Sequence, residues 1–403
     1  MSAVWTATVG QLLVEAGTVY AIVSASVGRR STQPCTLPRH FAPVSVLKPL
    51  CGAEPRLYDN LVAICRQQHP CFQLVFGVSA ADDPAIGVVQ RLQAEFPDCD
   101  IALVIDARIH GRNPKVSNLI NLYRAARHDH LVIADSDIAV PPDYLQRLAG
   151  PLSDPHVGVV TCLYRGRSVD NVWSRLGAAF IDDWFLPSVR VAHAGGSRRF
   201  GFGATIALRR DTLNAVGGFH ALANRLADDF WLAELTRHSG WQTVLSEMVV
   251  ETDVIETSLP ALWRHELRWL RTIRSLSAPG FHFMFVTFTW PMLLLGCLLA
   301  PLPVVFAIAL AGALARCAMA GSPARAVMAP LRDALLLAEW VAALGNGHVH
   351  WRGHVMTTID SPGLPATAEA PGGRPGMSPA TMPRALGGSL VASSHPHPQD
   401  KTR

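Results

Sequence analysis

Two acidic residues one position apart, Asp135 and Asp137, carry the clearest chemical signal in the sequence. They follow the apolar run 131–134, which is typical of a buried strand, and alternate residues of an extended chain point the same way. Mg²⁺ and Mn²⁺ prefer oxygen ligands such as these two carboxylates, and either ion also binds diphosphates. We therefore predict that Asp135 and Asp137 hold a divalent cation and that Asp135 also binds a nucleotide sugar; capping acids in a turn are the alternative. A second triplet, Asp98 to Asp100, is interpreted as a solvated loop.

The elements that must hold these acids alternate between strand and helix from residue 43 to about 246. Strands are expected at 44–47, 74–78, 101–105, 131–134 and 157–161, and helices at 57–67, 85–96, 116–127 and 144–149. This alternation predicts an α/β fold with a mostly parallel, doubly wound sheet, whose strand ends form the usual ligand crevice. No G-x-G-x-x-G follows the first strand, which argues against a dinucleotide-dependent oxidoreductase.

Further polar residues stand where they can join this crevice. Lys115 and Asn118 open a helix, and a helix N-terminus with a lysine is a natural phosphate site, with a simple surface charge as the alternative. Asp82 and Asp83 follow a strand, where they form either a nucleotide contact or a plain turn. The glycine-containing segment 201–205 is expected to be a loop that shapes the site, or an ordinary turn.

Two more motifs lie further along the chain. Asp228 and Asp229 stand at the start of an apolar helix, where aspartate is a favoured N-cap residue. Residues 262–275 form a basic amphipathic helix that includes Arg268 and Trp269. Such a helix can contribute to the site or rest on anionic lipid head groups, and we favour both uses together, with Arg268 at the site.

The composition is that of a membrane-associated protein. Of 403 residues, 49% are hydrophobic and 16% are charged, against about 25% charged in typical soluble domains. The net charge of +4 gives no reason to expect nucleic-acid binding. The eight cysteines include no C-x-x-C pair, so neither a zinc site nor a disulfide framework is predicted.

Apolar segments lie at both ends of the chain. Residues 4–28 contain one charge, Glu15, and precede Arg29-Arg30, which predicts a signal anchor whose C-terminal side is cytoplasmic; a buried amphipathic helix is the alternative. Residues 281–300 and 301–314 are expected to form a helical hairpin in the membrane. The segment 327–344 contains three charged residues, so it spans, re-enters or lies at the interface. The tail from residue 356 is predicted to be disordered.

The order and spacing of five motifs carry a family resemblance over roughly residues 40 to 300. The motifs are Phe76 to Val78 with Asp82 to Ile86, Asn113 to Leu119, Asp135 to Asp137, Asp228 to Phe230, and His265 to Trp269. Together they resemble the ceramide glucosyltransferase family of inverting glycosyltransferases, which have the GT-A fold. Within it, the chain is most similar to the bacterial branch associated with hopanoid biosynthesis.

The resemblance implies roles for individual residues. Asp229 would be the general base that takes a proton from the acceptor hydroxyl. Lys115 and Asn118 would contact the nucleotide diphosphate, Arg268 would neutralise the leaving UDP, and Trp269 would wall the acceptor pocket. The chain departs from the family pattern at two positions, Ala80 and His265. Because Ala80 replaces an acid, the nucleotide-reading role falls to Asp82 or Asp83, or to neither.

These expectations together describe a multi-pass protein of the bacterial inner membrane whose catalytic domain faces the cytoplasm. We expect an anchor at 1–30, a GT-A domain at 40–258, an interfacial helix at 259–280, membrane segments at 281–345 and a disordered tail at 356–403. The donor implied by the resemblance is UDP-N-acetylglucosamine, then UDP-glucose, and the acceptor is a hopanoid polyol such as bacteriohopanetetrol. Ceramide as acceptor, a processive polysaccharide synthase, and a non-catalytic protein that binds lipid or nucleotide are the rival interpretations.

Overall fold

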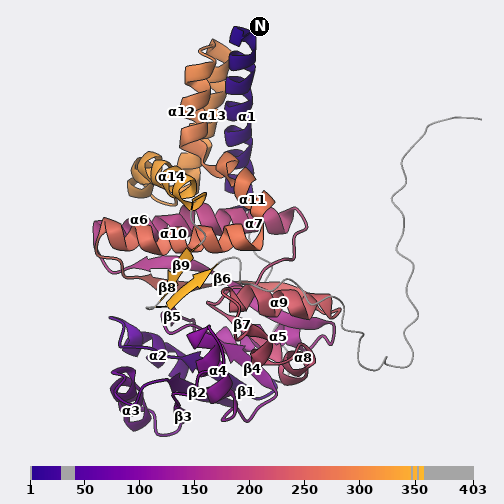
Figure 1. Ribbon diagram of the computed structural model, residues 1–403, viewed down its shortest axis with the longest axis vertical. Coiled ribbons are helices and arrows are strands. Elements are labelled where there is room, and N and C mark those ends of the chain that lie inside the picture. The colour runs from indigo at the N-terminus through magenta and orange to yellow at the C-terminus, as the bar shows by residue number, and fades with distance from the viewer. Residues whose placement is uncertain (1, 29–40, 346–347, 352–353, 358–403) are drawn as a thin grey trace, which may run out of the picture. The chain divides into compact units, whose positions relative to one another are not determined.

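The computed structural model describes residues 2–28, 41–345, 348–351 and 354–357 (Figure 1). These residues form an eight-stranded sheet in the order β3-β2-β1-β4-β7-β6-β8-β5. Its strands are β1 (Val44–Pro49), β2 (Phe72–Val78), β3 (Asp100–Ile105), β4 (His130–Ile133), β5 (Ile138–Ala139), β6 (Val157–Ser168), β7 (Ile206–Arg209) and β8 (Gln242–Val254). The Arg29-Arg30 pair and residues 358–403 of the expected tail lie outside the described residues.

The sheet is mixed, with four parallel and three antiparallel strand pairs. Strands β3, β2, β1 and β4 are parallel to one another, and β6 is parallel to β8. Strand β7 runs antiparallel between β4 and β6, and the two-residue β5 runs antiparallel beside β8. The chain makes a helical excursion between β6 and β7 and returns in the opposite direction, which strand-by-strand periodicity does not reveal.

Helices cover both faces of the sheet because successive strand residues point to opposite sides. Val46 packs in one hydrophobic core with helices α2 (Leu57–Cys65), α3 (Ala85–Glu95) and α5 (Tyr144–Leu152). Its neighbour Leu47 packs in the other, with α4 (Pro114–Tyr123), α8 (Arg210–Ala215), η2 (Phe219–Leu222) and α9 (Asp228–His238). The two cores confirm that the sheet is doubly wound.

A helical layer joins the sheet to the apolar helices (Figure 1). It contains α6 (Val172–Phe180), the π-helix η1 (Ile181–Phe185), α7 (Leu186–Ala194), α10 (Leu259–Leu276) and α14 (Pro323–Ala343). Side chains of α6, η1, α10, α11 (Ala278–Phe283) and α14 share one hydrophobic cluster. A short hairpin of β9 (His348–Trp351) and β10 (His354–Thr357) follows, so the first residues of the expected tail form a strand.

The apolar segments form a bundle of α1 (Ser2–Gly28), α12 (Thr289–Leu299) and α13 (Pro303–Met319) (Figure 1). Among the described helices, the stretch Val4–Gly28 alone is long and apolar enough to cross a membrane by itself. The expected hairpin is present as α12 and α13, but its first arm is shorter than predicted. The chain bends by 69° after α11 (Ala278–Phe283) and η3 (Met284–Thr287).

Helix α14 corresponds to the segment whose placement the sequence leaves open. It is bent by 118° from α13 and packs against α10 and α6. Two of its charged residues are buried in the contact with α10, where Arg332 lies 2.7 Å from Glu266 of α10 and 2.8 Å from Glu339. A third, Asp333, pairs with Arg316 of α13 at 2.7 Å. Helix α14 therefore lies at the junction between the bundle and the helical layer.

Candidate active site

The site begins where β1 and β4 end side by side. Strands β1 and β4 pair in parallel, so Lys48, near the end of β1, lies beside the segment that follows β4. The fully buried Lys48 Nζ donates a hydrogen bond to the backbone oxygen of Asp135 at 2.7 Å. Burial lowers the pKa of Lys48 to about 8, while the nearby carboxylates of Asp137, Asp135 and Glu54 act in the opposite direction. Lys48 thus fixes the turn that carries both acids.

Asp137 is the more deeply buried of the two acids. Thr252 of β8 donates a hydrogen bond from Oγ1 to its Oδ2 at 2.9 Å. Burial, together with the negative charges of Asp135 and Glu54, raises the pKa of Asp137 to about 7. Such a concentration of carboxylates is relieved when a cation binds between them.

The donor set fits a cation that a ligand helps to hold. In the part of the chain that the structure describes, no three His, Cys, Asp or Glu side chains are grouped to hold a metal ion. Mg²⁺ is commonly bound by only one or two carboxylates together with substrate phosphates. Asp135 and Asp137 match that pattern and do not match a closed structural site.

Asp229 lies at the start of α9, as predicted, and its carboxylate is held by two backbone amides. The amide of Gly203 donates to Oδ2 at 2.7 Å, and the amide of Phe230 donates to Oδ1 at 2.8 Å. Burial and the charge of Asp228 raise the pKa of Asp229 to about 6, although Lys115 opposes this shift. A carboxyl with that pKa is suited to take up a proton near neutral pH.

Lys115 connects the acids of the two motifs. Its Nζ lies 2.6 Å from Asp135 Oδ1 and 3.6 Å from Asp228 Oδ2. Burial lowers the pKa of Lys115, but the charges of Asp135, Asp228 and Asp229 outweigh it and hold the pKa above its usual value. The expected position at the start of α4 is correct, and this side chain faces the acids rather than open solvent.

Gly203 shows how closely these groups converge. A Cβ atom placed on Gly203 would lie 2.8 Å from Asp135 Oδ2, 3.2 Å from Lys115 Nζ and 3.3 Å from Asp229 Oδ2. The loop at 201–205 is therefore packed directly against the three charged side chains. Its shape is supported by Thr161 Oγ1, which donates to the Thr205 carbonyl at 2.8 Å and accepts from the Phe202 amide at 3.0 Å.

Three residues predicted to bind the nucleotide have other surroundings. Asp83 accepts hydrogen bonds from the amides of Gly52 and Ala85, so its carboxylate stabilises a turn. Asn118 is buried and donates to the Gly77 carbonyl at 2.8 Å at the end of β2. Asp82 is exposed. Their nucleotide-binding roles stay predictions.

An aromatic wall stands beside the acids. Tyr164 of β6 stacks on Phe185 at 4.8 Å between ring centroids and meets Trp269 edge-on at 6.2 Å. Burial raises the pKa of Tyr164 well above its usual value, and the charges of Asp229, Asp135 and Asp137 add to this while Arg268 opposes it. The basic helix therefore places Trp269 in this wall, and Arg268 is near enough for its charge to act on Tyr164. Tyr164 is a residue of this region that the sequence did not indicate.

His265, one of the two departures from the family pattern, supports this wall. Its Nδ1 forms a hydrogen bond with the Glu256 carboxylate, and its ring meets Trp269 edge-on at 5.1 Å. Despite burial, the hydrogen bond from His265 keeps the pKa of Glu256 below its usual value. His265 thus orients Trp269.

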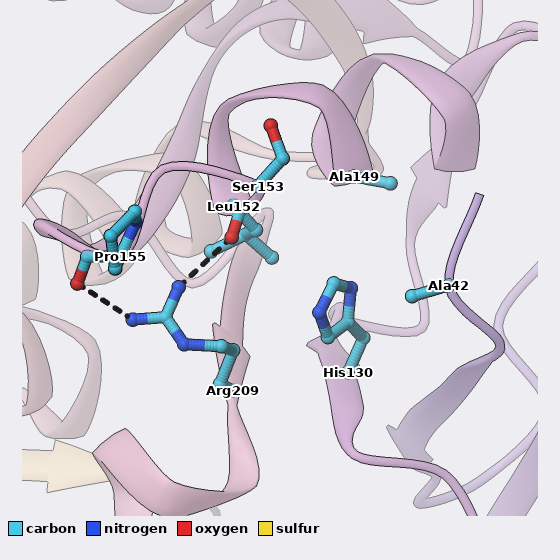
Figure 2. A pocket seen from close by; sticks show the side chains of 7 residues that line it. All are labelled: Ala42, His130, Ala149, Leu152, Ser153, Pro155 and Arg209. Atoms are coloured by element: carbon cyan, nitrogen blue, oxygen red, sulfur yellow. Dashed lines mark hydrogen bonds between the residues drawn. The ribbon is translucent and has the colours of Figure 1, made fainter. Parts of the chain in front are cut away.

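A separate hollow of about 360 Å³ lies away from these residues (Figure 2). Ala42, His130 and Arg209 line it, and Arg209 donates to the backbone oxygens of Leu152 at 2.9 Å and Pro155 at 3.2 Å. His130 begins β4, whereas Asp135 follows the other end of that strand. The hollow therefore lies at the opposite end of β4 from the two acids. Arg209 holds the segment that contains Leu152 and Pro155.

Comparison with known proteins agrees with this geometry. The sequence model of the family described as glycosyl transferase family 21 matches residues 10–362. The chain belongs to this family. The match includes Asp135, Asp229 and Trp269, the part of α1 from residue 10 onward, and all of α12 and α13. It confirms the predicted resemblance to ceramide glucosyltransferases.

The curated relatives of this chain include ceramide glucosyltransferases of Caenorhabditis elegans and Gibberella zeae. Ceramide glucosyltransferase 1 of Caenorhabditis elegans is 26% identical over 234 residues, which is 57% of this chain and 49% of the relative. Ceramide glucosyltransferase of Gibberella zeae is 33% identical over 125 residues, or 28% of this chain and 24% of the relative. The chain thus spans about half, or less, of the length of the curated relatives it matches.

A solved structure shows the same fold. A mannosyltransferase from Pyrobaculum calidifontis, in complex with GDP-Man and Mn²⁺, superposes with a TM-score of 0.51. It is 20% identical, and the alignment covers 84% of this chain and 99% of that one. The predicted GT-A-type α/β fold is confirmed, with the mixed sheet described above.

Proposed function

We propose that this family 21 protein is a membrane-bound inverting glycosyltransferase that moves a sugar from a nucleotide-diphosphate sugar to a lipid hydroxyl. The observation that carries the proposal is the convergence of Asp229, Lys115 and Asp135 around Gly203. Asp229 would accept a proton, and Lys115 would bind a diphosphate. The aromatic wall beside them shares a hydrophobic cluster with Phe281 and Leu336, which lie in the bent helix pairs that are further candidates for membrane spans.

The reaction follows from these positions in a single displacement. Asp229 takes the proton of the acceptor hydroxyl, and the oxygen attacks the anomeric carbon from the face opposite the diphosphate. The bond between that carbon and the diphosphate oxygen breaks, and the nucleoside diphosphate leaves with the bonding electrons. The configuration at the sugar carbon is inverted, and no covalent intermediate with the protein forms.

Positive charge stabilises the leaving diphosphate. Lys115 and Arg268 would supply this charge, and donor binding would exchange the Lys115–Asp135 ion pair for a contact with phosphate. Asp135 and Asp137 would hold a divalent cation, which supplies further positive charge to the diphosphate when bound. The archaeal mannosyltransferase that shares the fold was solved with Mn²⁺.

The donor and acceptor are assigned by resemblance. We propose UDP-N-acetylglucosamine first and UDP-glucose next, with a hopanoid polyol such as bacteriohopanetetrol as the acceptor, at the cytoplasmic face of a bacterial inner membrane. Ceramide is the second candidate acceptor, because the curated relatives of this chain are ceramide glucosyltransferases.

The test is a transfer assay of the full chain, purified in detergent with Mg²⁺ or Mn²⁺. UDP-N-acetylglucosamine, UDP-glucose and GDP-mannose are each offered with bacteriohopanetetrol and with ceramide, and the glycolipid is identified by mass spectrometry. We expect one pairing to give product, and Asp229→Asn to lose at least about 10²-fold in rate. Asp98→Asn is the matched control and should keep full activity, because Asp98 is the exposed first residue of the second triplet, whose last residue, Asp100, begins β3 and does not lie in a loop. Folded protein that forms no product and releases no nucleotide with any pairing would favour the non-catalytic interpretation.

A further inference from the structure

Asp137, the more buried acid of the proposed cation site, is tied to β8 by its side chain and by its backbone. Thr252 Oγ1 donates to its carboxylate at 2.9 Å, and the amide of Asp253 donates to its backbone oxygen at 3.0 Å. Immediately after Asp137, Ile138 pairs with Thr252 in the ladder between β5 and β8. The position of the Asp137 carboxylate therefore depends on whatever holds the end of β8.

The side chain of Asp253 is at the centre of a closed hydrogen-bond ring. Because successive residues of a strand point to opposite faces, this side chain lies on the other side of β8 from Thr252. Its Oδ1 accepts from Arg167 Nε of β6 at 2.7 Å, and its Oδ2 accepts from Asn60 Nδ2 of α2 at 2.8 Å. Arg167 Nη2 closes the ring by donating to Asn60 Oδ1 at 2.6 Å. The carboxylate is only 3% exposed, so three elements meet at one buried charge.

A second arginine connects this ring to the loop that follows β1. Arg56 Nη1 lies 3.5 Å from Asp253 Oδ1, and its Nη2 donates to the Ser168 carbonyl at 3.2 Å. Two residues before Arg56, the carboxylate of Glu54 accepts from Ser136 Oγ at 3.2 Å. Ser136 stands between the two acids of the proposed cation site. The network thus reaches these acids from β8 and also from the loop after β1.

We propose that Asp253 is a positioning residue for Asp137. Through its ring with Asn60 and Arg167 it holds the end of β8, and so it determines where the Asp137 carboxylate is available to a divalent cation. The inference rests on the proposed function and adds a residue that lies outside the five motifs of the sequence. Groups that orient metal ligands from behind typically change metal affinity or activity by about 10- to 100-fold when they are replaced.

The first test removes the charge of the ring and keeps the size of the side chain. In Asp253→Asn, an amide nitrogen replaces one acceptor oxygen and would meet the donor groups of Asn60 or Arg167. Mn²⁺ binding to the full chain in detergent is measured by electron paramagnetic resonance, with saturating UDP and, separately, with saturating GDP. We expect the Kd for Mn²⁺ to rise about tenfold, and kcat/KM for sugar transfer to fall by a similar factor.

The matched control is a buried carboxylate that bonds none of the acids of the site. Glu234 of α9 is 4% exposed, and its charged partners are Arg199, Arg237 and His238. Glu234→Gln should lower the melting temperature, because it removes a buried charge from its partners. Its Kd for Mn²⁺ should equal that of the wild type.

A charge exchange across the ring distinguishes positioning from general stability. Adding Asn60→Asp to Asp253→Asn moves the carboxylate from β8 to α2 and the amide from α2 to β8. The new carboxylate can accept from Arg167 and from the new amide, whose oxygen can accept from Arg167, so all three bonds of the ring can form again with the same net charge. We expect the double variant to recover most of the Mn²⁺ affinity that Asp253→Asn loses.

The melting temperature of each variant is measured beside its Kd. A folded Asp253→Asn that melts lower but binds Mn²⁺ like the wild type would overturn the inference, and so would a double variant that regains melting temperature without affinity. If Asp253→Asn does not fold, Asn60→Ala keeps the Arg167–Asp253 pair and should raise the Kd by a smaller factor; an unchanged Kd there would also overturn it. Wild type that binds no Mn²⁺ with either nucleotide would overturn it too. Wild type that binds Mn²⁺ but transfers no sugar would refute only the proposed function.

Discussion

At the scale of single residues, Gly203 limits the space among the charged groups. A Cβ atom there would approach Asp135, Lys115 and Asp229 within 2.8 to 3.3 Å, which none of them can accommodate without moving. Because a displacement of about 1 Å at a catalytic group can cost about 10²-fold in rate, we expect Gly203→Ala to lose activity on that order. The measurement is kcat/KM for the donor, together with the melting temperature to show that the variant folds.

The matched control is Gly87→Ala in α3, where an added Cβ would meet no atom within 4 Å. Alanine is favoured over glycine in a helix by about 1 kcal/mol, so this variant should be as stable as the wild type or more so. Its activity should be unchanged. Full activity in Gly203→Ala would show that the loop at 201–205 does not constrain the site.

The pH dependence of transfer reports on Asp229. Its pKa is raised to about 6, chiefly by burial, and a general base must be deprotonated to work. We expect kcat/KM for transfer to be constant above that pH and to fall about tenfold per pH unit below it. The profile is measured with saturating divalent cation. An acid limb that persists unchanged in the residual activity of Asp229→Asn would assign the titration to another group.

The sequence predicts the members of the site whose signal is local. Asp135 and Asp229 were predictable because an acid after a strand or at a helix start is visible over a few residues. Lys48 was not predicted, since its partner is a carbonyl 87 residues away. A lysine in an otherwise apolar strand was the available hint, because burial of an unpaired charge is costly. Asp83 and Asn118 were predicted to bind the nucleotide from their positions in the motifs. Those positions do not reveal that both side chains form hydrogen bonds with backbone groups of the protein.

At the scale of elements, the strands and helices of the first half of the GT-A domain could be predicted from period and spacing. Strand β7 was not predicted, because its four residues are placed by pairing with β4 and β6 and carry little pattern of their own. The long β8 contributes Thr252 to the site, and its partner β6 comes from a distant part of the chain. Pairing between strands that are distant in the sequence therefore determines the positions of β7 and β8, which the local sequence does not indicate.

The contact between α10 and α14 is held by a buried charged triad. Arg332 bonds Glu266 through both terminal nitrogens at 3.1 and 2.7 Å and reaches Glu339 at 2.8 Å. Removing the cation would leave two buried carboxylates without their partner, so Arg332→Met should destabilise the protein by about 3 to 5 kcal/mol. Thermal unfolding in detergent measures the loss.

Replacing the whole triad separates its charge from its packing. The variant with Arg332→Met, Glu266→Leu and Glu339→Leu has no buried charge at this contact, and such replacements are often neutral or stabilising. We therefore expect it to recover most of the stability lost in Arg332→Met. A triple variant as unstable as the single one would show that α14 is held mainly by the specific geometry of the triad.

At the scale of the whole molecule, the bundle depends on a very close approach of α1 to α12. A Cβ atom on Gly10 would lie 2.7 Å from the Gly296 carbonyl oxygen, and one on Gly296 would lie 2.5 Å from the Gly10 carbonyl oxygen. Small residues of this kind let membrane helices pack through their backbones. The sequence predicted both segments as apolar, but 286 positions separate these glycines and nothing local pairs them.

We expect Gly296→Leu to separate α1 from α12, because the added side chain meets the backbone of α1. The variant should lose several degrees of melting temperature in detergent, while its KM for the nucleotide sugar stays the same. Ala307→Leu adds similar bulk at an exposed position of α13 and serves as the control. Because the charged site is built from the sheet and its helices, donor cleavage by water should persist in both variants. A loss of that hydrolysis in Gly296→Leu alone would show that the bundle also shapes the donor site.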